Sequence, residues 1–176
     1  MAKKRSIFDR YTVNEKYIIT RGKALTFPAM QFNVPLKEDD VYGVVVDMPM
    51  TPTVLVTLVC YINGAANLYF NLGGDYSGSA SRYRAVAQAA HNFVKGCTGF
   101  VKECEKTTKY DLPIGGTHYV YMLTKSGTYK ISIAPTAIPA EDKTRRIIFN
   151  MYNSVMNELR TAQLKDQAAG IETGIN

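Results

Sequence analysis

The feature that most constrains the fold is a pair of β-branched runs joined by an asparagine-glycine dipeptide. The runs TVLVTLVCYI (53–62) and AANLYFNL (65–72) flank Asn63-Gly64. Asn-Gly is preferred in two-residue type I′ turns, because both central residues of that turn need positive φ. We therefore predict an antiparallel hairpin, and the fold must contain at least this one sheet element.

The hydrophobic period changes after the hairpin. From Ser81, apolar residues recur at alternating steps of four and three, which is the spacing of one helix face. They are Tyr83, Ala87, Ala90, Val94, Cys97, Val101 and Cys104. Gly96 and Gly99 do not change the phase of this stripe, so we predict one long helix. A second helix, from Pro139 or Ala140 to Lys165, is predicted by Ile148, Met151, Tyr152, Val155, Leu159 and Ala162.

Further strands are predicted on both sides of the first helix. The clearest runs are YGVVVDM (42–48), THYVYMLT (117–124) and TYKISIA (128–134), and the last two are joined by a three-residue loop, Lys125-Ser126-Gly127. YIIT (17–20) and MQFNV (30–34) are candidate short strands. The predicted class is therefore α+β, with a mainly antiparallel sheet of five or more strands packed by two long helices.

This order of elements resembles the profilin-like group, which includes the roadblock and longin domains. The likeness lies in the order of strands and helices over residues 42 to 165 and not in motif residues. The group consists of small sheets with helices packed on them, and many members act as binding or dimerisation modules. The chain departs from it by its extended N-terminal region and by three strands before the first long helix.

Three segments are predicted along the chain of 176 residues. Residues 1–40 form a basic N-terminal extension with short strands, residues 41–165 form a single α+β domain, and residues 166–176 form a loose tail. No apolar run approaches the ~18 residues of a membrane span. Cys60, Cys97 and Cys104 cannot all pair within one chain. Their spacing predicts reduced thiols in a cytoplasmic protein.

The positive charge is concentrated at the N-terminus. Residues 1–23 hold seven basic and two acidic residues, and so carry five of the six net positive charges. Such an arm can contact an acidic protein partner, nucleic acid or an anionic membrane, or can serve only as a solvated terminus. Nucleic acid is a possible partner but is not favoured, because no RNP-type motif is visible in the sequence.

The stretch NLGGDYSGSASRYR (71–84) is the candidate ligand site. Gly73 and Gly78 have the spacing of P-loop glycines, but Ser79 and Ala80 stand where lysine and a magnesium ligand are needed. A weaker anion site is the functional interpretation, because helix N-termini and arginines attract negative charge. A plain glycine-serine connector is the alternative. The candidate residues are Gly73, Gly74, Ser77, Gly78, Ser79, Ser81, Arg82 and Arg84.

Tyrosine is the unusual residue type, with twelve copies and no tryptophan. Five tyrosines fall on the predicted hairpins: Tyr61, Tyr69, Tyr119, Tyr121 and Tyr129. Tyrosine is enriched at protein interfaces, and it also packs across neighbouring strands. We therefore weigh an exposed interface on the sheet against ordinary cross-strand packing.

The catalytic signals are weak. His91 and His118 show no clear pairing with a cysteine, no nucleophile motif is present, and the histidines and cysteines lack the spacing of a zinc site. We expect no catalytic residue, metal or cofactor. The expected function is a non-catalytic intracellular binding or assembly module that acts through protein–protein contacts, including self-association. The alternatives are a small-anion or nucleotide-responsive domain at the Gly73–Arg84 loop and, third, an enzyme of unrecognised type.

Overall fold

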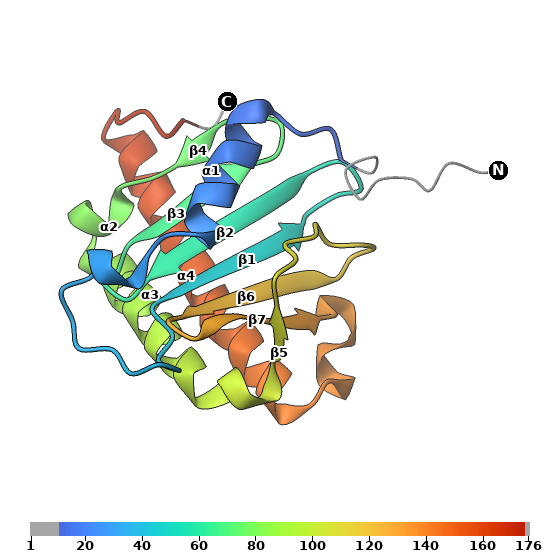
Figure 1. Ribbon diagram of the computed structural model, residues 1–176. Coiled ribbons are helices and arrows are strands. Elements are labelled where there is room, and N and C mark those ends of the chain that lie inside the picture. Colours follow the sequence, from blue (N-terminus) through green and yellow to red (C-terminus); the bar gives the residue numbers. More distant parts are fainter. Residues whose placement is uncertain (1–10, 175–176) are drawn as a thin grey trace.

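The computed structural model describes residues 11–174, and this part of the chain contains a seven-stranded sheet. The strand order is β4-β3-β2-β1-β6-β7-β5, and every neighbouring pair is antiparallel (Figure 1). The strands are β1 (Gly43–Pro49), β2 (Leu55–Tyr61), β3 (Ala66–Phe70), β4 (Asp75–Tyr76), β5 (Glu105–Thr107), β6 (His118–Thr124) and β7 (Gly127–Ile133). The predicted α+β class with an antiparallel sheet is confirmed.

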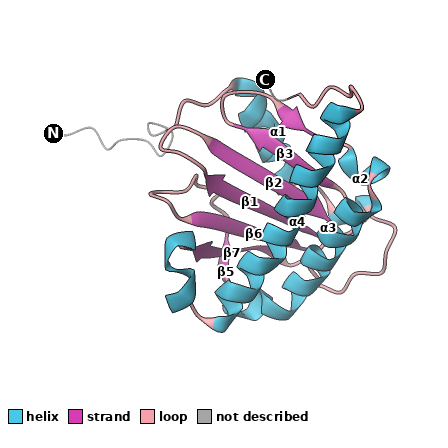
Figure 2. Cartoon of the chain, turned by 180° about the vertical axis from the view of Figure 1, so that it is seen from behind, coloured by secondary structure: helices cyan, strands magenta, loops and turns pink. Residues whose placement is uncertain are grey.

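Helices cover both faces of the sheet. The α-helices are α1 (Glu15–Leu25), α2 (Ser79–Arg82), α3 (Arg84–Cys97) and α4 (Lys143–Ala168). Within residues 11–174 the 3-10 segments are η2 (Ala29–Gln31), η3 (Thr98–Glu103) and η4 (Pro135–Ala140). The long helices α3 and α4 lie on one face, which we call the first face, and α1 lies on the opposite, second face (Figures 1 and 2). No helix within the described residues is long and apolar enough to cross a membrane.

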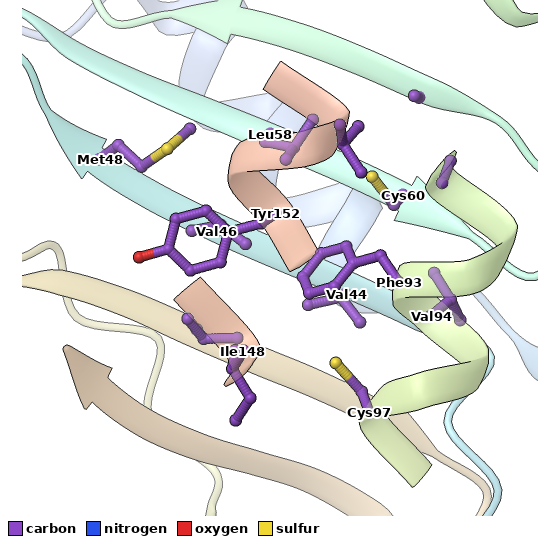
Figure 3. Packing of buried hydrophobic residues seen from close by; sticks show 14 of the residues in the cluster. Val44, Val46, Met48, Leu58, Cys60, Phe93, Val94, Cys97, Ile148 and Tyr152 are labelled. Carbon is purple, nitrogen blue, oxygen red and sulfur yellow. The ribbon is translucent and has the colours of Figure 1, made fainter. Parts of the chain in front are cut away.

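The main core fills the space between the first face and helices α3 and α4. Val44 and Val46 of β1 point toward Phe93 of α3 and toward Ile148 and Tyr152 of α4 (Figure 3). Successive side chains of a strand point to opposite faces. Val45 therefore packs in a separate cluster on the second face. Both faces of β1 are buried, as its continuous apolar run predicts.

The N-terminal region contains a helix where short strands were expected. Residues 17–20 lie in α1, whose first turn is capped by the Asn14 side chain accepting from the Lys16 amide. Tyr17, Arg21 and Ala24 are buried at helical spacing against the sheet. Residues 29–31 form η2, and no part of 30–34 is a strand. The β-branched run was misleading because cap and tertiary contacts outweigh local propensity.

The predicted single helix after the hairpin is divided. Tyr83 has extended backbone angles, φ −126° and ψ 110°, and separates the four-residue α2 from α3. After Cys97 the chain tightens into η3. The predicted stripe is still largely buried, and Gly96 has a packing reason: a Cβ there would lie 2.7 Å from the Met151 sulfur of α4.

Both hairpins are present, but their loop lengths differ from those predicted. The Tyr61 amide donates to the Ala65 carbonyl, so the first loop comprises Ile62, Asn63 and Gly64, and only Gly64 has positive φ. A three-residue loop of this kind places glycine at its left-handed position. In the second hairpin Thr124 pairs with Gly127, which leaves a two-residue loop.

The described chain after Lys165 completes α4 and contacts the body of the protein at a few residues. Helix α4 runs to Ala168, Gly170 has a φ of +74°, and the Ile171 amide donates to the Asp166 carbonyl. This is a Schellman-type helix end. Thr173 is buried, and the backbone of Gly174 lies against Asp75. A loose tail was predicted for residues 166–176; in the described part of it Asp166 and Thr173 are buried, whereas residues 167–172 and Gly174 are exposed.

Candidate functional site

The loop predicted to hold an anion is divided between a turn and a short helix. Gly73 and Gly74 form the turn between β3 and β4 and have positive φ. Ser77 is exposed and its hydroxyl donates to the Asp75 carboxylate at 2.7 Å. Gly78 precedes α2, and Ser79 is fully buried. Ser79 Oγ is the buried side-chain atom of residues 11–174 that has no hydrogen-bond partner.

Arg82 does bind a negative charge, and that charge belongs to the chain itself. Its Nη2 atom lies 2.5 Å from Asp166 Oδ2 near the end of α4. The hydroxyls of Tyr76 and Tyr83 donate to the same carboxylate, each at 2.6 Å. The hydrogen bond from Arg82, followed by those of the tyrosines, holds the pKa of Asp166 well below its usual range. We call these four residues the Asp166 cluster, and it ties α2 to α4.

The remaining candidates lie apart from this cluster. Ser81 is exposed and its hydroxyl donates to the Gly78 carbonyl. Arg84 is exposed at the first position of α3. The eight predicted residues therefore do not converge on one concavity.

Three of the predicted residues do share a small hollow. Gly73, Gly74 and Ser77 line a cavity of about 160 Å³ together with Lys16 and Thr20 of α1 and with Asp75. We call it the turn hollow. It holds one cation and one carboxylate, so its walls carry no net charge.

The five predicted tyrosines do not form one exposed surface. Tyr121 is fully buried, and its hydroxyl donates to the Asp111 carbonyl at 2.6 Å. Tyr61 packs on Phe27 after α1, and Tyr69 packs with the second-face clusters. Tyr119 holds Lys130 over its ring at 3.6 Å. Tyr129 packs with the first-face core. Most of these rings serve cross-strand and α1 packing, and Tyr61, Tyr69, Tyr119 and Tyr129 keep partial exposure.

A buried polar network on the second face was missed by the sequence reasoning. Arg21 of α1 pairs with Asp47 of β1 at 2.6 Å, and its Nη1 donates to the Tyr110 carbonyl at 3.0 Å. Thr57 donates to Asp47 at 2.7 Å and lies 2.6 Å from the Tyr17 hydroxyl. Asp47 interrupts an otherwise apolar strand, and a charge there needs a partner. That interruption is the signal in the sequence that could have revealed the network.

The histidines and thiols are engaged or buried. His118 Nδ1 lies 2.8 Å from the Tyr152 hydroxyl, and burial lowers the pKa of this imidazole to about 4. Burial raises the pKa of all three cysteine thiols, that of Cys104 to about 11. A thiol with a raised pKa is a poor nucleophile at neutral pH. Within residues 11–174 no group of three His, Cys, Asp or Glu side chains could hold a metal ion.

Exposed apolar side chains are concentrated in α1 and in the segment that follows it along the chain. Ten large apolar residues are exposed in residues 11–174, and five of them fall between residues 18 and 34. Ile18 and Ile19 lie on α1, while Phe27 and Met30 lie in the segment directly after it. Met30 is 86% exposed. We call these four residues the α1 patch. Helix α1 itself lies on the second face of the sheet, away from α3 and α4 (Figure 1).

Comparison with known proteins adds no relative. No family model, no curated protein and no solved structure matches the chain. The likeness to profilin-like domains in element order therefore stays a prediction.

Proposed function

We propose that the chain is a non-catalytic binding module that docks a protein partner on the α1 patch. The observation that carries this proposal is the concentration of exposed apolar side chains on one helix and the segment after it. Exposed apolar groups that gather on a small part of a surface mark interaction sites. The three free cysteines support a cytoplasmic location for this module.

The charges around the patch favour a partner with an acidic rim. Lys16 and Lys23 of α1 are exposed beside the patch, and Glu15 is the acidic residue of that helix. The basic residues among positions 1–10 add to this charge in the sequence and lie outside the described residues. Self-association through two copies of the patch would bring like charges together. An acidic partner is therefore favoured over a second copy.

The proposal is tested by removing the apolar groups without adding charge. We expect the double variant Ile19→Gln, Met30→Gln to bind the partner about tenfold more weakly, because central apolar contacts carry most of the energy of an interface. The immobilised full chain would be used to capture proteins from cells that produce it, at low and at high salt. The matched control is Leu164→Gln, which removes from α4 an apolar side chain whose exposure lies between those of Ile19 and Met30.

We expect to capture a protein that binds the control variant and does not bind the patch variant. Its binding should be weaker at high salt than at low salt. The proposal fails if the patch variant and the control capture the same proteins equally well. Light scattering covers the alternative occupant: a concentration-dependent mass that the patch variant abolishes would assign the patch to self-association.

A small-anion function at the turn hollow is the second candidate. The observation that favours it is that Gly73, Gly74 and Ser77 line one cavity with Lys16. The Asp75 carboxylate in the same wall weakens this candidate, because it repels a bound anion. Inorganic phosphate should raise the melting temperature of the wild type and of Lys109→Met, an exposed-lysine control, but not that of Lys16→Met. An equal response in all three proteins excludes this candidate.

A further inference from the structure

A larger hollow lies where residues 34–41 and the end of the β2 hairpin meet α3. Its volume is about 400 Å³, which falls within the range of small-molecule sites. Val34, Pro35, Leu36 and Ile62 form an apolar wall. We call it the α3 hollow. It shares no residue with the turn hollow or with the α1 patch.

Charges of both signs line the α3 hollow without neutralising each other. Lys95 lies on α3 one turn after His91, and Asp40 lies in the facing segment. Among the described residues Lys95 forms no ion pair, and so it does not pair with Asp40. An apolar wall beside a separated cation and carboxylate can accept a ligand that carries both charges.

The hydrogen bonds already formed around the hollow determine which of its polar groups can still donate a hydrogen bond to a ligand and which can accept one. Thr98 Oγ accepts from the Val41 amide at 3.0 Å, so its hydroxyl hydrogen is left to donate. His91 Nδ1 lies 2.7 Å from the Ile62 carbonyl oxygen. Because a carbonyl only accepts, Nδ1 carries the hydrogen and Nε2 of the neutral ring accepts. The hollow therefore offers two donor groups, Lys95 and Thr98, and two acceptor groups, Asp40 and His91.

The loop that forms one wall is held in place by three contacts. Lys125 Nζ donates to the Leu36 carbonyl at 2.8 Å. The Ser126 amide donates to the Glu38 carbonyl, and the Ser126 hydroxyl donates to Asp39 at 2.7 Å. A preformed wall reduces the ordering cost of binding.

We propose that the α3 hollow binds a small zwitterion with an apolar body, of which the apolar α-amino acids are the simplest examples. The ligand carboxylate binds Lys95 and Thr98, its ammonium group binds Asp40 and His91, and its side chain packs on the apolar wall. A simple anion fits less well, because Asp40 would face it without a partner. This site is independent of protein docking at the α1 patch.

The proposal is tested with L-leucine and two analogues that each lack one charge. 4-Methylpentanoate lacks the ammonium group, and 3-methylbutylamine lacks the carboxylate. Titration of the full chain, followed by NMR at the amides around His91, should show millimolar or tighter binding of leucine. Each analogue should bind about tenfold or more weakly, since a hydrogen bond to a charged group is lost.

Variants assign each charge to its residue. Leucine should bind Lys95→Met no more tightly than 3-methylbutylamine binds the wild type. Leucine should bind Asp40→Asn no more tightly than 4-methylpentanoate binds the wild type. Asparagine keeps an oxygen that can accept from the Lys37 amide, as Asp40 does. Lys102→Met is the control, because Lys102 is exposed and lies outside the hollow. The proposal is overturned if leucine does not bind the folded wild type, if 4-methylpentanoate binds equally well, or if Lys95→Met leaves the affinity unchanged.

Discussion

His118 couples the stability of this protein to pH. Burial lowers the pKa of its imidazole from 6.5 to about 4, so the folded state favours the neutral ring. Its contribution to the free energy of unfolding is complete above pH 6.5 and is lost as the pH falls toward 4, at roughly 1.4 kcal/mol per pH unit. We expect His118→Gln to flatten the pH dependence of urea unfolding in that interval. NMR titration of the ring checks the pKa directly, and a midpoint near 6.5 would refute the prediction.

The case of Arg82 shows how far a sequence can assign a single residue. Its position suggested a bound anion, and an anion is present. The partner is Asp166, which lies 84 positions further along the chain and was expected in a loose tail. A pairing of such separation depends on how α2 and α4 pack, and nothing near Arg82 in the sequence encodes it. Asp47 differs in this respect, because a carboxylate within an apolar strand signals a buried partner by itself.

At the scale of elements, two glycines provide a matched test of backbone geometry. Gly64 closes the β2–β3 hairpin with a φ of +90°, and a Cβ there would lie 3.0 Å from the Ala87 carbonyl oxygen. We expect Gly64→Ala to lower the free energy of unfolding by about 1–3 kcal/mol, because it adds strain and a backbone contact. Gly99 in η3 has open space around it and no positive φ. Gly99→Ala should therefore stabilise the protein slightly, by about 0.4–1 kcal/mol.

Thermal and urea unfolding of both variants measure this contrast. Equal destabilisation by the two substitutions would show that the hairpin loop does not have the described conformation.

The elements that could be predicted are those whose pattern is long and whose packing is regular. Strands β1, β2, β3, β6 and β7 and helix α4 lie close to their predicted ranges. Helix α1 was mistaken for a strand because YIIT has strand propensity, whereas its cap, Asn14, and its buried spacing decide the outcome. The hairpin loops were assigned the wrong lengths because the same glycine suits two-residue and three-residue loops.

At the scale of the whole molecule, the two faces of the sheet are closed by different means. The first face is closed by apolar packing of two long helices, which the sequence stripes predict. The second face is closed by α1 through a smaller apolar cluster and the Arg21–Asp47 pair. This third layer was not predicted, because it depends on the buried pair as well as on apolar spacing. It also explains why Tyr121 is buried and why Tyr61, Tyr69 and Tyr119 are partly buried.

The Arg21–Asp47 pair should therefore determine whether the second face stays closed. Asp47→Asn leaves the Arg21 charge buried without a counter-ion, and breaking a buried pair in this way costs about 3–5 kcal/mol. We expect amide hydrogen exchange to accelerate first in α1, whose loss need not open the first-face core. The control is Asp142→Asn, since Asp142 pairs with Arg145 at the surface and asparagine can still cap α4. If Asp47→Asn destabilises the chain no more than the control, or accelerates exchange equally in α1 and α4, then α1 is held by apolar packing alone.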